Sequence, residues 1–281
     1  MIISIRLCDF AVNQKNMKDL KDKIVWITGA SSGIGEATAY QMAKEGAKLV
    51  LSARRKEELE RVKKACNVPE DDILVLPLDV EDFDSFEKHK ETVLNTFGRI
   101  DLLFNNAGIS QRGGVLESSL EVFQKIININ LLGVVALTKV VLPEMVKQKS
   151  GHIVVTSSIS GKLGSPKRSS YSASKHALHG FFDALRSEVH YDNIKVTMIC
   201  PGYIQTDISI NAIGADGSQH GQMDSNQANG IPVEVCARKI VKAIKSDKSE
   251  IYIGGKEVLG VYLKRFFPKI LEKVVLNQAP K

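Results

Sequence analysis

The sequence lacks several features that define other classes of protein. It has no internal repeat, no low-complexity tract and no uninterrupted run of about 18 apolar residues that could span a membrane. Its four cysteines lie far apart and form no CxxC pair, a pattern typical of free thiols in a reducing compartment. The N-terminus shows no signal-peptide cleavage pattern. The chain is therefore predicted not to be an integral membrane protein.

Motifs of several other chemistries are absent as well. There is no G-x-S-x-G turn to present a nucleophilic serine, and the histidines show no metal-ligand spacing with cysteines or carboxylates, so neither hydrolysis nor a metal is expected. The 38 basic residues exceed the 32 acidic ones by 38 − 32 = 6. This surplus suits an anionic ligand or a membrane surface, but the basic residues are scattered, and no nucleic-acid partner is expected.

What the sequence does contain is a regular alternation of apolar runs and helical patterns. Its 281 residues, 43% of them hydrophobic, can bury a substantial core. Strands that alternate with helices imply right-handed crossovers and a parallel sheet. We therefore predict a single α/β domain with a doubly wound, Rossmann-type parallel sheet and helices on both faces. The expected strands are 24–27, 48–52, 73–76, 102–104, 153–156, 196–199 and 251–253. The first expected helix follows the first strand and its turn and ends near residue 45. The others span 57–65, 85–97, 120–148 (bent or broken at Pro143), 171–190 and 232–245.

The chain divides into three parts. Residues 1–22 form a loose polar leader, 23–254 the folded domain, and 255–281 an amphipathic tail that Pro268 should split into two short helices. Within the domain, the polar, glycine-rich stretch 207–231 is too long for an ordinary connection, which indicates a functional loop. The apolar face of the tail has two interpretations. It packs on the domain or across a homodimer or homotetramer interface, or it lies on an anionic membrane surface.

A glycine-rich turn follows the first predicted strand. Gly29, Gly33 and Gly35 have the spacing G-x-x-x-G-x-G between that strand and a helix. Glycines allow the backbone to approach a pyrophosphate, whose charge then meets the N-terminus of the helix. The alternative is a merely tight turn. The position in the first strand–helix unit favours dinucleotide binding.

The end of the second strand indicates which dinucleotide is bound. In such folds an acidic residue about 20 positions after the glycines binds the ribose of NAD, whereas an arginine accommodates the 2′-phosphate of NADP. Arg54 stands 54 − 33 = 21 positions after Gly33 and is followed by Arg55, with no acid between them. This pattern favours NADP(H). The alternative is that both arginines are solvated charges at the start of a helix.

A tyrosine and a lysine could supply proton transfer. Tyr171 and Lys175 are four residues apart in a predicted helix and share one face. A nearby ammonium favours the phenolate, so Lys175 should lower the pKa of Tyr171 from its usual value of about 10. Such a tyrosine can exchange a proton with a carbonyl or alcohol oxygen. Alone, this spacing is a weak signal, because it is more often that of an ordinary surface pair on a helix.

These motifs together resemble the short-chain dehydrogenase/reductases over about residues 23–253. The segments 28–35, 105–108, Ser158, 171–175 and 201–202 occur in the order of that family. The segments 176–183, 201–204 and 211–218 are similar to its "member seven" subgroup, especially the B form. Relatives in this subgroup carry an N-terminal membrane anchor, which this sequence does not show.

The resemblance implies four catalytic roles. Tyr171 would protonate the carbonyl oxygen, Lys175 would hold the nicotinamide ribose, Ser158 would hydrogen-bond the substrate oxygen, and Asn130 would position a water for proton relay. The alternative for Asn130 is a buried side chain that bridges backbone groups. The competing neighbours are Ser157, whose spacing to the tyrosine is wrong by one, and Asn128, which lies in the same run as Asn130.

The resemblance also implies how NADP(H) binds. The residues after the third strand would meet the adenine, those after the fourth would back the ribose, and those after the sixth would meet the nicotinamide carboxamide and phosphate. The implied cofactor-binding residues are Gly29, Ser31, Ser32, Gly33, Ile34, Gly35, Arg54, Arg55, Asp79, Val80, Asn106, Ala107, Gly108, Tyr171, Lys175, Pro201, Gly202, Ile204 and Thr206.

The function that the resemblance implies is an NADP-dependent oxidoreductase that interconverts a carbonyl and a secondary alcohol. Its implied substrate is a small lipidic molecule of the acyl or alkyl dihydroxyacetone phosphate, steroid or retinoid class. Its implied location is the cytoplasmic side, soluble or peripherally associated with the endoplasmic reticulum or peroxisome membrane. The competing hypothesis is a catalytically idle nucleotide-binding sensor or scaffold on the same fold.

Overall fold

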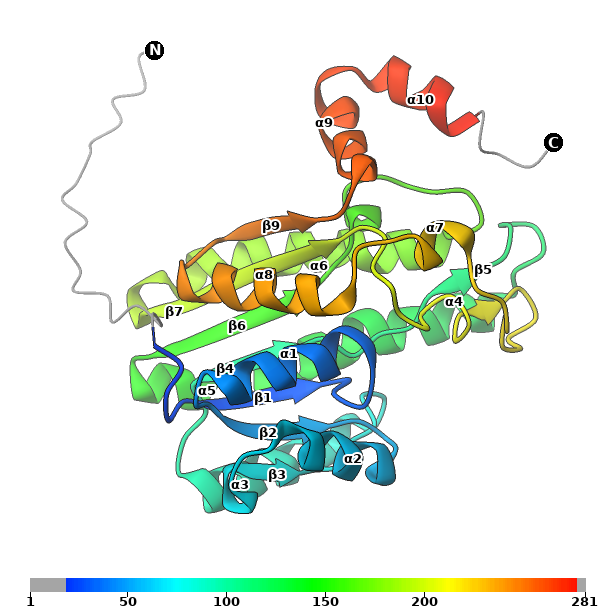
Figure 1. Ribbon diagram of the computed structural model, residues 1–281. Coiled ribbons are helices and arrows are strands. Elements are labelled where there is room, and N and C mark those ends of the chain that lie inside the picture. The colour runs from blue at the N-terminus through cyan, green and yellow to red at the C-terminus, as the bar shows by residue number, and fades with distance from the viewer. Residues whose placement is uncertain (1–18, 277–281) are drawn as a thin grey trace, which may run out of the picture.

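The computed structural model describes residues 19–276, which are built around a seven-stranded parallel sheet (Figure 1). The strand order is β3-β2-β1-β4-β6-β7-β9, so the winding reverses between β1 and β4. In such sheets, ligands bind outside the carboxyl ends of the strands at this reversal. The strands are β1 (Ile24–Thr28), β2 (Lys48–Ser52), β3 (Ile73–Val75), β4 (Leu102–Asn105), β6 (Gly151–Thr156), β7 (Ile194–Pro201) and β9 (Glu250–Ile253).

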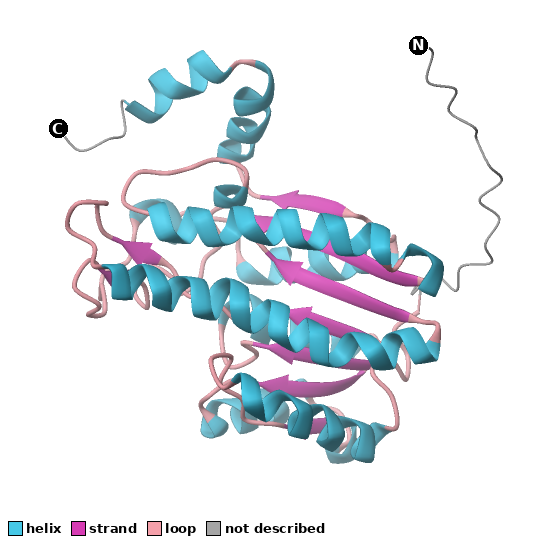
Figure 2. Ribbon diagram, turned by 180° about the vertical axis from the view of Figure 1, so that it is seen from behind, coloured by secondary structure: helices cyan, strands magenta, loops and turns pink. Residues whose placement is uncertain are grey.

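Helices cover both faces of the sheet. Figure 1 looks onto the face covered by α1, α2 and α8, and Figure 2 onto the face covered by α3, α5 and α6. Both layers contribute apolar side chains to the core. The helices are α1 (Gly33–Lys44), α2 (Lys56–Cys66), α3 (Phe86–Phe97), α4 (Leu120–Ile127), α5 (Gly133–Gln148), α6 (Ser169–Glu188), α7 (Ser225–Ala228), α8 (Val233–Lys245), α9 (Leu259–Phe266) and α10 (Pro268–Leu276).

The sequence of β1 explains why both faces need a layer of helices. Its five residues are all buried. Val25 and Ile27 belong to the core under α1, α2 and α8, whereas Ile24 and Trp26 belong to the core under α3, α5 and α6. A strand with apolar side chains on both faces is stable only in the middle of a covered parallel sheet. The predicted fold, a single doubly wound α/β domain, is confirmed.

The long helical region 120–148 differs from the prediction at its irregular point. Pro143 lies inside α5 without ending it. The irregularity is instead the π-helical turn η3 (Asn128–Leu132), where the N–H of Gly133 donates to the carbonyl oxygen of Asn128. Such turns occur frequently at functional sites. Pro143 is tolerated because it lies near the end of a helix that packing holds in place.

The connections also differ from a plain alternation of helices and strands. The stretch 207–231 contains α7 and β8 (Ile213–Gly214), and β8 pairs in parallel with β5 (Gln111–Arg112), so this stretch is tied to the segment after β4. Leu20, which precedes the predicted start of the domain, is fully buried in the core. The remaining short turns are η1 (Glu70–Asp72), η2 (Phe83–Ser85), η4 (Ile159–Gly161), η5 (His190–Asp192) and η6 (Lys256–Val258).

One helical region among the described residues, Leu120–Gln148, is long and apolar enough to cross a membrane, with a mean hydropathy of 1.9. Length and composition alone do not separate a membrane helix from a core helix. Leu137, Val141 and Met145 of this region are buried in the core against the sheet. Packing within the domain therefore accounts for part of this apolar composition.

The tail forms two helices, α9 and α10, on either side of Pro268, as predicted. Their contacts with the domain are few: Gly260 lies against Leu163, and the ring of Tyr262 lies 6.1 Å from that of Tyr252. Many of the tail's apolar side chains are exposed rather than packed on the domain, contrary to one part of the first interpretation. The exposed ones are Leu259, Tyr262, Phe266, Phe267, Ile270, Val274 and Leu276. The predicted leader up to residue 18 and the end of the tail, 277–281, lie outside the described residues.

Candidate active site

A cavity of about 610 Å³ opens at the carboxyl ends of the strands. It gathers the loops that follow β1, β2, β4, β6 and β7, which are far apart in the sequence. All predicted site residues line it except Gly35 and Asn130. The predicted residues in its wall are Gly29, Ser31, Ser32, Gly33, Ile34, Arg54, Arg55, Asp79, Val80, Asn106, Ala107, Gly108, Ser158, Tyr171, Lys175, Pro201, Gly202, Ile204 and Thr206.

The turn after β1 has a backbone that requires glycine. Gly29 has a φ of +64°, in the left-handed region. At Gly35 a Cβ would lie 2.2 Å from the carbonyl oxygen of Gly29, so a side chain there would force the turn apart. Ser32 is the N-cap of α1, but its side chain makes no capping hydrogen bond. The first N–H groups of α1 therefore have no side-chain cap, and the turn fits an anion such as a pyrophosphate.

Arg61 of α2 braces this turn. Its guanidinium donates to the carbonyl oxygen of Ser31 at 3.2 Å and pairs with Glu36 at 2.7 Å. The hydroxyl of Tyr40 donates to the same carboxylate at 2.6 Å. Burial would raise the pKa of Glu36, but its hydrogen bonds with Arg61 and Tyr40 lower it overall. No pattern in the sequence indicates this contact, because it joins side chains of two different helices.

Ser158, Tyr171 and Lys175 lie together in the wall of the cavity. Nζ of Lys175 lies 5.8 Å from the centre of the Tyr171 ring and donates to the carbonyl oxygen of Thr156 at 2.8 Å. The hydroxyl of Ser158 accepts from the N–H of Ser160 at 3.0 Å and influences Tyr171 through a hydrogen bond. The spacing of these residues in the sequence therefore predicts their grouping in space.

The pKa values in this group differ from the prediction. The pKa of Tyr171 is raised, because burial of the phenol outweighs the hydrogen bond with Ser158 and the charges of Arg168 and Arg112, which lower it. Burial also lowers the pKa of Lys175 to about 8. The prediction that Lys175 lowers the pKa of Tyr171 is wrong for the protein alone. That prediction considers only the nearby ammonium, whereas desolvation of the buried phenol has the larger effect on the pKa.

Asn130 lies in the π-helical turn and is fully buried. Its amide accepts from the N–H of Ile109 at 2.8 Å and donates to the carbonyl oxygen of Ile109 at 2.9 Å. It also donates to the hydroxyl of Ser174 at 3.1 Å. These bonds match the alternative expectation of a side chain that bridges backbone groups. Its carbonyl oxygen also lies beside Gly108, as Nζ of Lys175 does, so Asn130 and Lys175 approach the same residue.

Asn106 connects three of the strand ends around the cavity. Its side-chain N–H₂ donates to the carbonyl oxygens of Thr28 and Gly29 at 3.2 and 3.3 Å. Its side-chain oxygen accepts from the hydroxyl of Thr156 at 3.1 Å. The N–H groups of Asn106 and Ala107 in turn donate to the hydroxyl of Thr28 at 3.0 and 3.1 Å. This network holds the ends of β1, β4 and β6 in register.

Several residues of the site were not predicted. Arg112 and Arg168 line the cavity, and both pair with Asp224 at the N-terminus of α7. Gln227 of α7 donates to the hydroxyl of Thr206 at 3.3 Å. Arg168 is the N-cap of α6, three residues before Tyr171, and this closeness in the sequence is a usable signal. The contact of Arg112 with Asp224 crosses 112 positions and leaves no local pattern.

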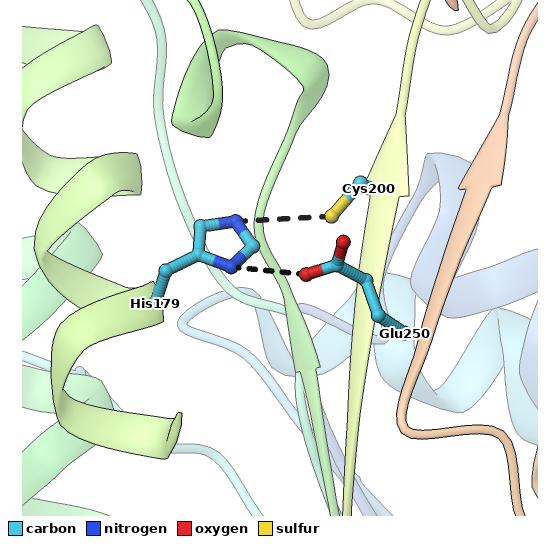
Figure 3. A group of neighbouring side chains, drawn as sticks. All are labelled: His179, Cys200 and Glu250. Carbon is cyan, nitrogen blue, oxygen red and sulfur yellow. Dashed lines mark hydrogen bonds and ion pairs between the residues drawn. The ribbon is translucent and has the colours of Figure 1, made fainter. Parts of the chain in front are cut away.

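A buried cluster behind the cavity joins α6, β7 and β9 (Figure 3). Nδ1 of His179 lies 3.3 Å from Oε2 of Glu250, and its Nε2 lies 3.8 Å from Sγ of Cys200 and 2.9 Å from the hydroxyl of Ser157. The three side chains are close enough to hold a metal. However, the glutamate and the thiol face different nitrogens of the ring. Burial also raises the pKa of Cys200, which disfavours the thiolate that a metal requires. The contacts are those of a hydrogen-bonded support under Ser157.

The fold and the site define a short-chain dehydrogenase. The sequence model of the family described as short chain dehydrogenase matches residues 23–215, and the chain belongs to this family. An oxidoreductase of this kind acts on CH–OH groups or the corresponding carbonyls and uses a nicotinamide dinucleotide.

The chain is most informatively compared with proteins of the member-seven group. It is 46% identical to dehydrogenase/reductase SDR family member 7 of Mus musculus over 256 residues, covering 89% of this chain and 76% of the relative. It is 43% identical to a protein of Anopheles gambiae named dehydrogenase/reductase SDR family protein 7-like, and the match covers 99% of this chain and 89% of the relative. Member 7B of Mus musculus is 39% identical, and the match covers 93% of this chain and 83% of the relative. The predicted resemblance to this subgroup is confirmed.

Solved structures agree with the fold. A short chain dehydrogenase/reductase from Burkholderia phymatum, in complex with NAD, superposes with a TM-score of 0.80 at 25% identity and covers 90% of this chain and 96% of its own. Levodione reductase superposes with a TM-score of 0.73 at 29% identity and covers 85% of this chain and 99% of its own.

Proposed function

We propose that this protein is an NADP-dependent oxidoreductase that interconverts a carbonyl and a secondary alcohol. The observation that carries the proposal is the group of Ser158, Tyr171 and Lys175 in the wall of a cavity that the glycine turn also lines. The nicotinamide would supply or accept the hydride. The protein would bind and orient both reactants and handle the proton.

Each residue has a defined part in this reaction. Tyr171 would donate its phenolic proton to the carbonyl oxygen, and its raised pKa keeps that proton in place in the protein alone. Ser158 would hydrogen-bond the same oxygen. Lys175 would hold the ribose and replace the proton, since its pKa of about 8 makes it a ready donor near neutral pH. Asn130 would place the water that connects Lys175 to solvent.

The competing hypothesis is an idle nucleotide sensor or scaffold, and a tyrosine variant separates the two. Tyr171→Phe keeps the ring but removes the proton donor. We expect kcat for reduction of a carbonyl substrate by NADPH to fall by about 10²–10⁴-fold, while the dissociation constant for NADPH changes little. Tyr191→Phe, at an exposed tyrosine outside the cavity, is the matched control. Equal turnover in Tyr171→Phe and wild type would refute the mechanism, and no turnover of any carbonyl by wild type would favour the sensor.

The preference for NADP is supported by the end of β2. Arg54 and Arg55 line the cavity and are exposed, and among the described residues neither has an acidic partner within ion-pair distance. No carboxylate follows β2 where the ribose of NAD would need one. Two guanidinium groups at this position suit a 2′-phosphate.

The substrate is proposed to be a lipidic carbonyl compound of the acyl or alkyl dihydroxyacetone phosphate, steroid or retinoid class. Residues 23–254 would form the NADP-binding catalytic domain, with 207–231 as the loop that covers the substrate. Ile208, Asn211, Ala212 and Ile213 from this loop line the cavity, which supports that role.

The tail 255–281 is proposed to rest on an anionic membrane surface. Many apolar side chains of α9 and α10 are exposed, and Lys264, Arg265, Lys269 and Lys273 lie among them, as an interfacial helix pair requires. The location would then be the cytoplasmic side of the endoplasmic reticulum or peroxisome membrane. A homodimer or homotetramer that covers the same face is the competing arrangement.

A further inference from the structure

Arg112 and Arg168 form a basic pair in the wall of the cavity. Nε of Arg112 and Nη2 of Arg168 each donate to Oδ2 of Asp224 at 2.9 Å. The arginine side chains are only 9% and 19% exposed. One carboxylate balances one of the two charges, so the pair retains one net positive charge in a largely buried position.

This charge lies beside the reacting group. Arg168 is the N-cap of α6, and Tyr171 follows three residues later, in the first turn of the helix. The charges of Arg168 and Arg112 both act on Tyr171. The glycine turn and Arg54 line other parts of the cavity wall and offer sites there for the anionic groups of a dinucleotide. An anion at the arginine pair would therefore belong to the substrate.

The hydrogen bonds of the pair leave donors for such an anion. Arg112 is held by Asp224, by the hydroxyl of Ser110 at 2.7 Å and by the carbonyl oxygen of Gln111 at 2.7 Å. Arg168 uses only Nη2 among the described residues. Both arginines line the cavity, whereas Asp224 does not. The carboxylate thus orients the pair from outside the cavity.

The second arginine is not explained by loop anchoring alone. One guanidinium is enough to pair with Asp224 and fasten the loop, and a second buried charge without its own counter-ion is costly. An anionic substrate group would offset that cost. The planar donor array of a guanidinium binds carboxylate or phosphate oxygens well.

We propose that Arg168, supported by Arg112, is an anion-binding subsite that selects carbonyl substrates carrying a carboxylate or phosphate group. This inference rests on the proposed oxidoreductase function and names its substrate class. Asp224 is the fixed counter-ion of the subsite, and Tyr171 lies one helical turn away from it.

The test compares three aldehydes that differ in one substituent: 4-formylbenzoate, its neutral methyl ester, and 4-formylphenyl phosphate. With the full chain and NADPH, we expect kcat/KM for at least one anion to exceed that for the ester by about tenfold or more, the size of a charge-assisted hydrogen bond. Arg168→Gln should remove that advantage, so that the ratio of kcat/KM for the anion to kcat/KM for the ester falls to about one. Comparing kcat/KM for 4-formylbenzoate with that for 4-formylphenyl phosphate tells which anion is preferred.

Lys167→Gln is the matched control, because Lys167 is the exposed neighbour of Arg168 and does not line the cavity. It should leave all three substrates unchanged. Equal losses for the anions and the ester in Arg168→Gln would show a structural role and overturn the subsite. If that variant does not fold, Arg168→Lys replaces it, because lysine keeps the charge without the planar array. We expect Arg168→Lys to retain only part of the anion preference. An anion preference equal to that of the wild type would also overturn the proposal.

A binding measurement separates failure of the subsite from failure of the proposed function. Benzoate should raise the midpoint of thermal unfolding of the NADP⁺-saturated wild type, and not that of Arg168→Gln. Turnover of the ester without any anion preference or benzoate effect would overturn the subsite alone. Stabilisation by benzoate in a protein that reduces no carbonyl would overturn the oxidoreductase function alone.

Discussion

At the residue scale, burial decides the chemistry of the tyrosine–lysine pair more than their separation does. The spacing of Tyr171 and Lys175 predicts their contact, and the structure places Nζ 5.8 Å from the ring centre. The direction of the Tyr171 pKa shift could not be read from spacing, because it depends on how completely the fold removes water. A protonated tyrosine beside a lysine that titrates near 8 suits donation of a proton, as carbonyl reduction requires.

The choice between NADP and NAD is also a residue-scale question. In the double variant Arg54→Gln, Arg55→Gln, the charge-assisted contacts with a 2′-phosphate are lost. We expect the dissociation constant for NADPH to rise by about 10–100-fold and that for NADH to change by less than about threefold. Isothermal titration with both cofactors measures this.

Lys56→Gln is the control for this experiment. Lys56 is the next exposed cation along the chain and does not line the cavity, so the variant should leave both affinities unchanged. Equal affinities of the wild type for NADPH and NADH would contradict the cofactor preference.

At the element scale, strands were more predictable than the segments that complete the site. Most strands contain a short apolar run, such as residues 24–27 of β1, and their positions follow from this hydrophobic pattern. The π-helical turn that carries Asn130 has the same composition as a regular helix, so no sequence pattern marks it. β5 and β8 have two residues each and pair across about a hundred positions, too little for a strand signal. The contact between Arg112 and Asp224 likewise joins distant positions, so the sequence alone does not predict it.

The edge strand β9 is held by Glu250, whose ionisation should support the fold. Burial raises the pKa of Glu250, but hydrogen bonds with His179, Lys162 and Tyr252 outweigh it and lower the pKa from 4.5 to about 2. A lowered carboxyl pKa stabilises the folded state above the unfolded value, and this contribution is lost as the pH falls from about 4.5 to 2. Glu250→Gln should therefore lower the free energy of unfolding by about 1–3 kcal/mol at pH 7.

Urea unfolding followed by circular dichroism at pH 7 and at decreasing pH below 4.5 measures this effect. The difference between wild type and Glu250→Gln should shrink as the pH falls, because protonated glutamate resembles glutamine. Glu91→Gln, at an exposed carboxylate in α3, should show no such pH-dependent difference. A constant difference at all pH values would mean that side-chain shape, rather than charge, accounts for the loss.

At the scale of the whole molecule, the cavity and the start of the tail are directly connected. The carboxylate of Glu257 accepts from the N–H of Tyr203 at 2.9 Å and from that of Gly255 at 3.0 Å. Tyr203 lines the cavity and follows β7. Figure 1 shows α9 and α10 projecting from the same end of the sheet as α7 and β5. A surface that received the tail would therefore lie on the side of the molecule where the substrate enters.

The last prediction concerns that surface. A chain that ends after Val258 keeps the contacts of Glu257 but removes the exposed apolar side chains of α9 and α10. We expect the full chain to float with liposomes that contain anionic lipid, more weakly with neutral ones, and the shortened chain to float with neither. The double variant Phe266→Ser, Phe267→Ser should weaken flotation without shortening the chain, since both rings are exposed. Equal partition of the full and shortened chains onto anionic liposomes would rule out the membrane role. In that case a concentration-dependent difference in molecular mass between the two would assign the apolar face to contacts between copies of this chain.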